Sequence, residues 1–221
     1  ACGVGKGDLG MTNDLTLVAP VNAIRYCGAE PVLVDMQADW QVDIRAMANW
    51  FMPKAYLTVS LLGGLPSLWG IPICPIILDA AQALGNTQLP KRLEHAAVAI
   101  LSFNGNKLIT AAGGGMVVTN VFVLAGTCYG LRNQARVASM EIAHDEIGYN
   151  YRLSNLQAAV GLAQLETIEE RLRRKRLIAE RYDAGLLTIP GISTRPRLDG
   201  DASWLYTIKV DAALYRWNSR D

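Results

Sequence analysis

Lys107 is the first residue whose type and surroundings could do chemistry. It ends the segment Ser102-Phe103-Asn104-Gly105-Asn106-Lys107, which follows an apolar run and precedes the glycines 113–115. A lysine on a tight, glycine-flanked loop after a buried strand can form a Schiff base with an aldehyde. Asp79 ends the preceding apolar run, Ile76-Ile77-Leu78, where a carboxylate could hold a protonated pyridine nitrogen. The pair indicates pyridoxal phosphate (PLP) chemistry, although a lysine without this context is usually a solvated surface charge.

Two further side chains near this pair carry groups that a cofactor could use. Gln82 lies three residues after Asp79, so a helical turn starting here would place its amide on the same side, within reach of a ring hydroxyl. Ser102 could donate its hydroxyl to a phosphate, because the nearby glycines allow close approach. Local sequence alone leaves ordinary structural roles open, since Asp79 could cap the next helix and Ser102 could bond backbone at a strand end.

The elements that must position these side chains are short apolar runs, which alternate with helix-like segments along the chain. The run 21–26 ends at Gly28, and a buried strand closed by Asp35 is expected next. The predicted strands are 31–34, 55–59, 73–78 and 96–103. This alternation predicts an α/β fold with a mostly parallel sheet flanked by helices, in which ligands bind at the carboxyl ends of the strands.

The connection between the strands 55–59 and 73–78 is too short for a comfortable crossover helix with loops. It also contains residues that oppose a helix, namely Gly63, Gly64, Pro66, Gly70 and Pro72. We therefore expect either an irregular connection or a chain from which residues are missing.

A long helix is predicted from Ser154 to about Tyr182, with Ser154 and Gln157 in capping-box spacing. Its basic run, 171–176, follows acids one turn earlier, with Glu169–Arg173 and Glu170–Arg174 as i,i+4 pairs. These pairs favour a solvated helix face over a nucleic-acid patch. Pro190-Gly191 then breaks the chain, and 205–210 is predicted as a strand of a second unit. The expected organisation is a large cofactor-binding domain at 1–185 and the beginning of a smaller α/β domain, incomplete here, at 186–221.

The amino-acid composition limits which class of binding partner is expected. The 221 residues are 51% hydrophobic and 19% charged with a net charge of +1, which favours small metabolites over nucleic acid or a membrane surface. The four cysteines form no C-x-x-C pair and only two histidines accompany them, so no metal site is expected. The stretch 3–7 lacks the spacing of a phosphate loop, and neither a membrane span nor a secretory signal is found. These features predict a soluble, cytoplasmic protein.

Three motifs in order resemble the DegT/DnrJ/EryC1/StrS family of PLP-dependent sugar aminotransferases. They are Asp79-Ala80-Ala81-Gln82-Ala83-Leu84-Gly85, Ser102 to Lys107 with Gly113-Gly114-Gly115-Met116, and Gly148-Tyr149-Asn150-Tyr151-Arg152-Leu153-Ser154-Asn155. The lysine loop, with 131–136 and 144–147, is similar to the branch that acts on nucleotide-linked 4-keto-6-deoxy sugars. The resemblance implies a fold-type I PLP-dependent transferase, active as a homodimer whose sites are each completed by the neighbouring subunit.

The resemblance also assigns a role to each matching residue. Lys107 would bind the cofactor aldehyde, Asp79 the pyridinium nitrogen, Gln82 the ring oxygen and Ser102 the phosphate. Asn150 would reach the phosphate of the cofactor in the neighbouring subunit, whereas its local sequence alone favours a loop asparagine bonded to its own backbone. Two positions depart from the family pattern: Ser60 stands where relatives more often carry His or Asn, and Leu78 replaces a frequent acidic residue.

The implied activity moves an amino group from glutamate to the keto carbon, expected to be C4, of such a nucleotide sugar, in polysaccharide biosynthesis. Three alternatives remain. A PLP-dependent sugar dehydratase would replace the lysine by histidine, and a non-catalytic regulatory member would keep the fold alone. A nucleotide-binding oxidoreductase would carry G-x-G-x-x-G after its first strand, which is absent here.

Overall fold

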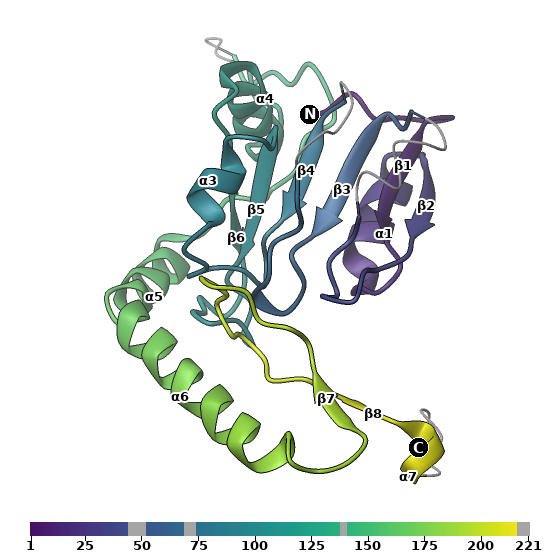
Figure 1. The fold of residues 1–221 in the computed structure, drawn as a ribbon. Helices are drawn as coiled ribbons and strands as arrows, with labels where there is room; N and C mark the ends of the chain where they lie inside the picture. Colours follow the sequence, from purple (N-terminus) through teal and green to yellow (C-terminus); the bar gives the residue numbers. More distant parts are fainter. Residues whose placement is uncertain (44–51, 69–73, 138–140, 216–221) are drawn as a thin grey trace.

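A computed structural model describes residues 1–43, 52–68, 74–137 and 141–215. Its centre is a six-stranded sheet in the order β2-β1-β3-β4-β5-β6 (Figure 1). Strands β1 to β5 pair in parallel, and only β6 runs antiparallel, to β5. The bounds are Leu9–Asn13 (β1), Glu30–Val34 (β2), Ala55–Val59 (β3), Ile76–Asp79 (β4), Val98–Ser102 (β5) and Gly115–Val118 (β6). The predicted mostly parallel sheet is therefore confirmed.

Helices flank this sheet, and the apolar core lies between the two layers. Helix α1 packs at the β1–β2 side, whereas α3 and α4 lie at the β5 side (Figure 1). The helical bounds are Val18–Tyr26 (α1), Leu61–Gly63 (η1, a 3-10 turn), Leu89–Leu93 (α3), Phe122–Arg132 (α4), Asn155–Leu165 (α5), Ile168–Leu186 (α6) and Ala212–Tyr215 (α7). The largest side chains that are completely buried come from the central strands, Tyr56 on β3 and Leu78 on β4. Within the described ranges, no helix has the length and apolar character needed to cross a bilayer.

The structure corrects two expectations about the strands at the β2 end of the sheet. The strand expected to be buried, β2, is a half-exposed edge strand with Leu33 55% exposed, because it has a neighbour on one side only. Strand β1 was not predicted at all, since its sequence Leu-Gly-Met-Thr-Asn has no apolar run. Its buried Asn13 is satisfied by Val59 of β3, which donates its N–H to Oδ1 (3.1 Å) and accepts from Nδ2 (3.2 Å).

The described part of the connection from β3 to β4 is irregular, in agreement with the first of the two alternatives expected from the sequence. After Val59 the chain makes the 3-10 turn η1, in which Leu62 adopts a positive φ of 55°. It then runs through the buried Leu65 and Leu68. Residues 69–73, including Gly70, Pro72 and the expected strand start at residue 73, lie outside the described residues. Strand β4 begins at Ile76 and pairs directly with β3.

The single long helix predicted from Ser154 is two helices, α5 and α6. The capping box that starts α5 is confirmed, because the Ser154 Oγ accepts the Gln157 N–H at 3.3 Å. The chain then leaves helical geometry at Thr167, whose hydroxyl donates to the Gln164 carbonyl and accepts from the Arg171 side chain. This local bonding competes with the helix and breaks it.

Arg173, Arg174 and Arg176 of the basic run on α6 are exposed, as expected, whereas Lys175 turns inward and one of the predicted ion pairs differs. Glu170 binds Arg174 at 2.6 Å, which confirms the predicted i,i+4 pair. Arg173 also pairs with Glu170, at 2.7 Å, in place of the predicted Glu169. One carboxylate therefore serves both guanidinium groups on this exposed surface.

Beyond α6 the chain forms a small two-stranded sheet of its own. Strand β7 (Ile192–Thr194) pairs antiparallel with β8 (Ile208–Val210), and this hairpin extends away from the large sheet (Figure 1). The predicted strand 205–210 is therefore shorter, and β7 was not predicted. Between the two strands, residues 195–207 return to the carboxyl ends of the main sheet.

Candidate functional site

Asp79 lies where the sequence placed it, as the last residue of β4. Its Oδ1 accepts the Ala81 N–H at 3.0 Å within a turn, and the next helix, α3, begins only at Leu89, so the helix-cap role that sequence alone left open is not observed. Burial raises the pKa of Asp79, while the Ala81 N–H and the positive charge of Lys107 act in the opposite direction. A buried carboxylate held against a cation is suited to binding a protonated ring nitrogen.

Lys107 lies on the loop after β5, which is the next strand in the sheet. Its N–H donates to the Asn104 carbonyl at 3.0 Å, which closes the tight turn. Burial lowers the pKa of Lys107, whereas the charge of Asp79 raises it. The structure therefore brings the two predicted residues within electrostatic reach of each other. A lysine with a lowered pKa holds more of its amine in the free, nucleophilic form.

Gln82 is buried three residues after Asp79, and one end of its side-chain amide already makes a hydrogen bond. Its Oε1 accepts the Leu62 N–H at 2.8 Å, which holds the strained η1 turn against the loop after β4. Within the described residues no hydrogen bond is made by its Nε2 group. That amide nitrogen is therefore the atom that could donate to a ring oxygen.

Ser102 ends β5 and behaves as a strand-end serine. Its Oγ accepts the Asn104 N–H at 3.3 Å, so the structural role that sequence alone favoured is present. A hydroxyl that accepts one hydrogen bond keeps its own hydrogen, and Ser102 can still donate that hydrogen to a phosphate.

Asn150 is separate from these four residues. Its backbone bridges Asn133 at the end of α4, and its side chain is exposed. In the part of the chain that the structure describes, no hydrogen bond joins it to Asp79, Gln82, Ser102 or Lys107. Its role toward a neighbouring subunit stays a prediction.

Two residues of the site were not predicted as such. Trp204 lies over the lysine, with the Lys107 Nζ 4.4 Å from the centroid of the indole ring. Ser60, at the end of β3, is 0% exposed and donates its N–H to the Asp79 carbonyl, yet its Oγ has no hydrogen-bond partner among the described residues. Ser60 had been noted only as a departure from a pattern. The sequence around Trp204 does not predict this role, because the residues it contacts, Asn106 and Lys107, lie almost 100 positions earlier in the chain.

These residues fit PLP. The cofactor needs an anion at its ring nitrogen, a primary amine at its aldehyde and hydrogen-bond donors at its ring oxygen and phosphate. Asp79, Lys107, Gln82 and Ser102 supply one group each at the carboxyl ends of two adjacent strands. The unpaired Ser60 hydroxyl in the same place is a buried polar group that a ligand could satisfy.

Comparisons with known proteins agree with this geometry. A Bacillus subtilis protein, EpsN, which bears the name of a pyridoxal phosphate-dependent aminotransferase, is 36% identical over an aligned length of 232, gaps included, which covers 96% of this chain and 59% of that protein. The GDP-perosamine synthase of Vibrio cholerae is 36% identical over an aligned length of 224, which covers 96% of this chain and 60% of that enzyme. The aminotransferase TlmJ from Streptoalloteichus hindustanus superposes with a TM-score of 0.85 at 27% identity, covering 97% of this chain and 62% of TlmJ.

The chain thus spans about three fifths of the length of the proteins it matches. The profile of the DegT/DnrJ/EryC1/StrS aminotransferase family matches residues 1–219. With that match, the α/β fold and the PLP-compatible site, the chain belongs to the DegT/DnrJ/EryC1/StrS family of PLP-dependent aminotransferases.

Proposed function

We propose that this chain carries the cofactor site of a nucleotide-sugar aminotransferase. The enzyme would move an amino group from glutamate to the keto carbon, C4, of a nucleotide-linked 4-keto-6-deoxy sugar. The observation that carries the proposal is the placement of Asp79 at the end of β4 and of Lys107 on the loop after the adjacent strand β5, within electrostatic reach of each other. The similarity to GDP-perosamine synthases supports a nucleotide sugar as the acceptor.

Each residue has a defined task in this reaction. When bound, PLP supplies an electron-withdrawing ring that stabilises negative charge on the substrate carbon. Asp79 would keep the ring nitrogen protonated, the Gln82 Nε2 would orient the ring through its oxygen, and the Ser102 hydroxyl would hold the phosphate. Lys107 would hold the aldehyde end of the cofactor, and its amine, when free, would accept the proton that leaves Cα of the amino donor. Its lowered pKa favours this use as a base.

The retained Lys107 favours a transaminase over the sugar dehydratase alternative, in which histidine replaces the lysine. The family match sets aside the nucleotide-binding oxidoreductase. A non-catalytic member would bind the cofactor without responding to an amino donor, and the experiment below separates it from an enzyme.

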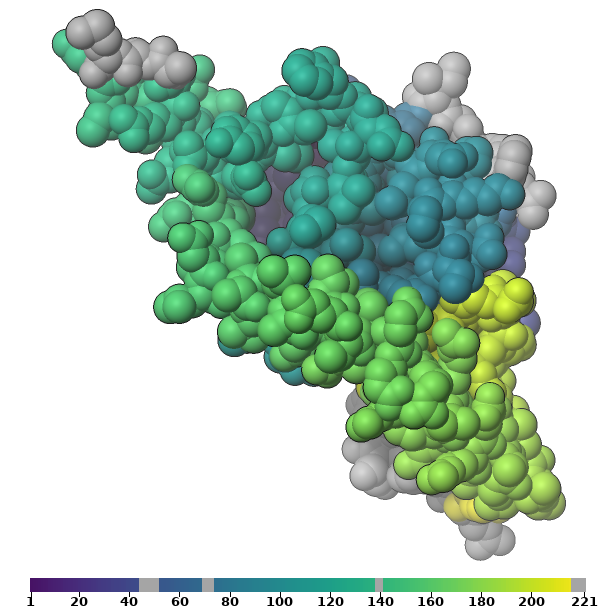
Figure 2. Space-filling view, turned by 90° about the vertical axis from the view of Figure 1, so that its left-hand side faces the viewer, coloured from purple at the N-terminus to yellow at the C-terminus, as the bar shows by residue number. Residues whose placement is uncertain are grey.

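A homodimer is part of the proposal, and the surface around Asn150 supports it. No residue of α5 is buried, and its Leu156 is 82% exposed, while the preceding segment presents Ile147 at 86%. Figure 2 shows α5 and α6 (green) lying uncovered across one face of the molecule. Contiguous apolar surface of this kind marks a protein interface. Asn150 lies within the same stretch, so a second copy packed here would bring it toward that copy's cofactor.

We also place the enzyme in the cytoplasm, in polysaccharide biosynthesis. The four cysteines, Cys2, Cys27, Cys74 and Cys128, all carry free thiols, as is usual in a reducing compartment. The donor and the nucleotide sugar are small metabolites of the same compartment.

Spectroscopy of the full-length protein tests the proposal. Protein purified with PLP should show the absorption band of the lysine-bound cofactor, and glutamate should bleach it. Adding 4-keto nucleotide sugars one at a time should restore the band, with the amino sugar identified by mass spectrometry. Lys107→Ala should bind the cofactor without turnover, whereas Lys91→Ala, on the exposed surface of α3, should behave as wild type. Full transamination by Lys107→Ala would refute the proposal.

A further inference from the structure

Trp204 joins the C-terminal part of the chain to the lysine loop by two contacts. The Lys107 Nζ lies 4.4 Å from the centroid of its ring, and its Nε1–H donates to the Asn106 carbonyl at 3.0 Å. The indole is 5% exposed and packs with Leu108 and Leu172. It therefore contacts the lysine amine, the residue before the lysine and the residue after it.

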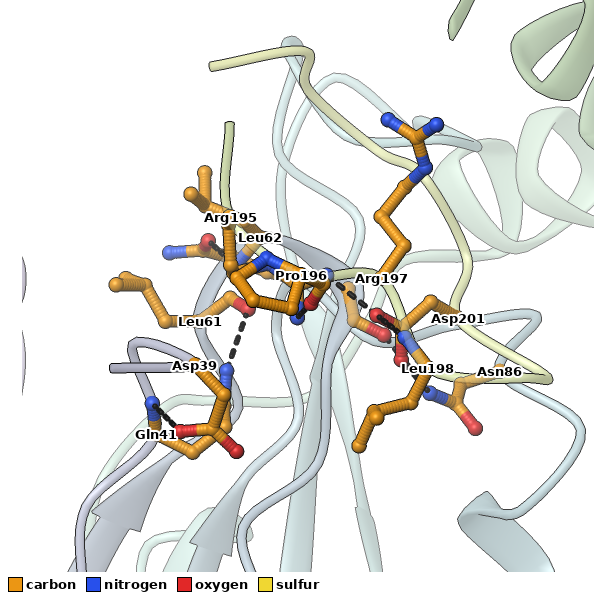
Figure 3. A network of polar contacts seen from close by, with 12 residues as sticks. Asp39, Gln41, Leu61, Leu62, Asn86, Arg195, Pro196, Arg197, Leu198 and Asp201 are labelled. Carbon is orange, nitrogen blue, oxygen red and sulfur yellow. Dashed lines mark hydrogen bonds and ion pairs between the residues drawn. The ribbon is translucent and has the colours of Figure 1, made fainter. Parts of the chain in front are cut away.

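The segment that carries Trp204, residues 195–204, is closed on itself by a buried ion pair; we call it the C-terminal strap. Arg195 Nη2 and Asp201 Oδ2 are 2.5 Å apart, and the two side chains are 5% and 4% exposed. Figure 3 shows Asp201 facing both Arg195 and Asn86. The Asn86 amide donates to Asp201 at 3.4 Å and to the Gly63 carbonyl at 2.8 Å. Asp201 thus ties the strap to Asn86 in the loop after β4, and the same Asn86 amide joins that loop to η1.

Backbone contacts fix the strap just before Trp204. The Ala202 N–H donates to the Gly63 carbonyl at 3.3 Å, and the Thr87 N–H donates to the Gly200 carbonyl at 3.0 Å. At Trp204 itself, the Lys175 Nζ of α6 donates to the backbone carbonyl at 3.0 Å. The backbone that carries the indole is therefore held by contacts that do not involve Lys107.

We propose that Trp204 is a positioning residue for Lys107 and that the C-terminal strap makes residues 195–204 part of the cofactor site. The inference rests on the proposed function, in which the lysine is freed from the cofactor and must return to it. An ammonium group is attracted to the face of an indole, and the N–H bond to Asn106 holds the loop in its turn. The strap would keep the released amine at the face of the indole, so that it returns to the cofactor from a prepared position.

The rate of cofactor capture tests this without relying on turnover. Full-length protein stripped of PLP is mixed with PLP, and the absorption band of the lysine-bound cofactor is followed over time at several pH values. Trp204→Leu removes the ring and its N–H bond to Asn106, so the lysine loop is no longer held in place and capture should slow by about 2- to 13-fold, the range of one lost hydrogen bond. Trp204→Phe keeps an aromatic face but loses the N–H bond, so it should slow capture by about 2- to 5-fold.

A matched control lies two residues further along. Tyr206 stacks on Tyr182 with the ring centroids 4.8 Å apart and donates its hydroxyl hydrogen to Asp183, and among the described residues it makes no hydrogen bond or ring contact with the lysine loop. Tyr206→Leu should therefore capture PLP within about 2-fold of wild type. In steady state, Trp204→Leu should lower kcat and leave the KM for glutamate within about 2-fold, since the indole acts on the lysine and not on the donor.

The outcomes separate this proposal from the function on which it rests. If wild-type protein captures no PLP, the proposed function fails. If wild type captures PLP and Trp204→Leu does so equally fast, or if Tyr206→Leu is slowed as much as Trp204→Leu, the positioning role fails. Should Trp204→Leu not fold, as judged by circular dichroism, Trp204→Phe decides: a capture rate equal to that of wild type overturns the proposal.

Discussion

Removing the carboxylate of Asp201 should destabilise the protein far more than removing a surface carboxylate. Asp201 is the partner of Arg195 at 2.5 Å, and both side chains are almost completely buried. It also accepts the Leu198 N–H at 3.2 Å and an Asn86 N–H at 3.4 Å. Asp201→Ala would leave the guanidinium in a dry site with the Pro196 carbonyl at 3.1 Å as its remaining acceptor among the described residues.

The magnitude follows from that burial. Breaking a buried pair by removing one partner costs about 3–5 kcal/mol of unfolding free energy, because an uncompensated charge stays inside. The assay is urea unfolding of the cofactor-free protein, followed by circular dichroism. Glu170→Ala is the matched control, since Glu170 pairs with Arg173 and Arg174 on the exposed face of α6 and should change little.

A double variant separates the ion pair from the shape of the site. Arg195→Met with Asp201→Leu removes both charges, so it should recover much of the stability lost in Asp201→Ala. The loss in Asp201→Ala should also be nearly the same at low and at high salt, because a buried pair is weakly screened. A loss below about 1 kcal/mol in Asp201→Ala would refute the reasoning, because an exposed pair contributes that much.

Three further predictions concern the site and its supports. The negative charge of Asp79 raises the pKa of Lys107, so Asp79→Asn should lower that pKa. The pH at which cofactor-free protein captures PLP at half its maximal rate should then be lower than in wild type. An unchanged or higher midpoint pH would contradict this prediction. If Asn150 completes the neighbouring site, mixing Asn150→Ala with Lys107→Ala subunits should restore transamination that neither has alone, whereas no recovery would place Asn150 elsewhere. Gly85 has a φ of +89°, and an added Cβ would lie 2.6 Å from the Leu172 side chain. Gly85→Ala should therefore lower the free energy of unfolding, measured in urea, by about 1–3 kcal/mol. An unchanged free energy of unfolding would be inconsistent with this packing.

The sequence was informative where the structural cause is local. Strands β3 and β4 are apolar runs, the capping box spans four consecutive residues, and Asp79 and Lys107 are marked by their immediate neighbours. Strand β1 could not be predicted in this way, since the polar Asn13 is satisfied by Val59, 46 residues away. The break between α5 and α6 depends on how Thr167 bonds its own turn, and threonine is common enough in helices that its presence alone is a weak signal.

The same distinction applies to the site. Trp204 bonds Asn106 across 98 residues, and Asn86 bonds Asp201 across 115. Neither contact has a spacing that sequence reasoning could recognise, because only the folded sheet brings the C-terminal strap back to the carboxyl ends of β4 and β5. The cofactor-binding residues were therefore predictable as candidates, whereas the residues that hold them in place were not.

The most direct test of the account is to locate the bond between the cofactor and the protein. Full-length protein incubated with PLP is reduced with borohydride, which makes the link to lysine permanent, and is then digested and analysed by mass spectrometry. The account predicts a phosphopyridoxyl group on Lys107, in the peptide that follows β5. A stable adduct on another lysine, with Lys107 unmodified, would contradict it.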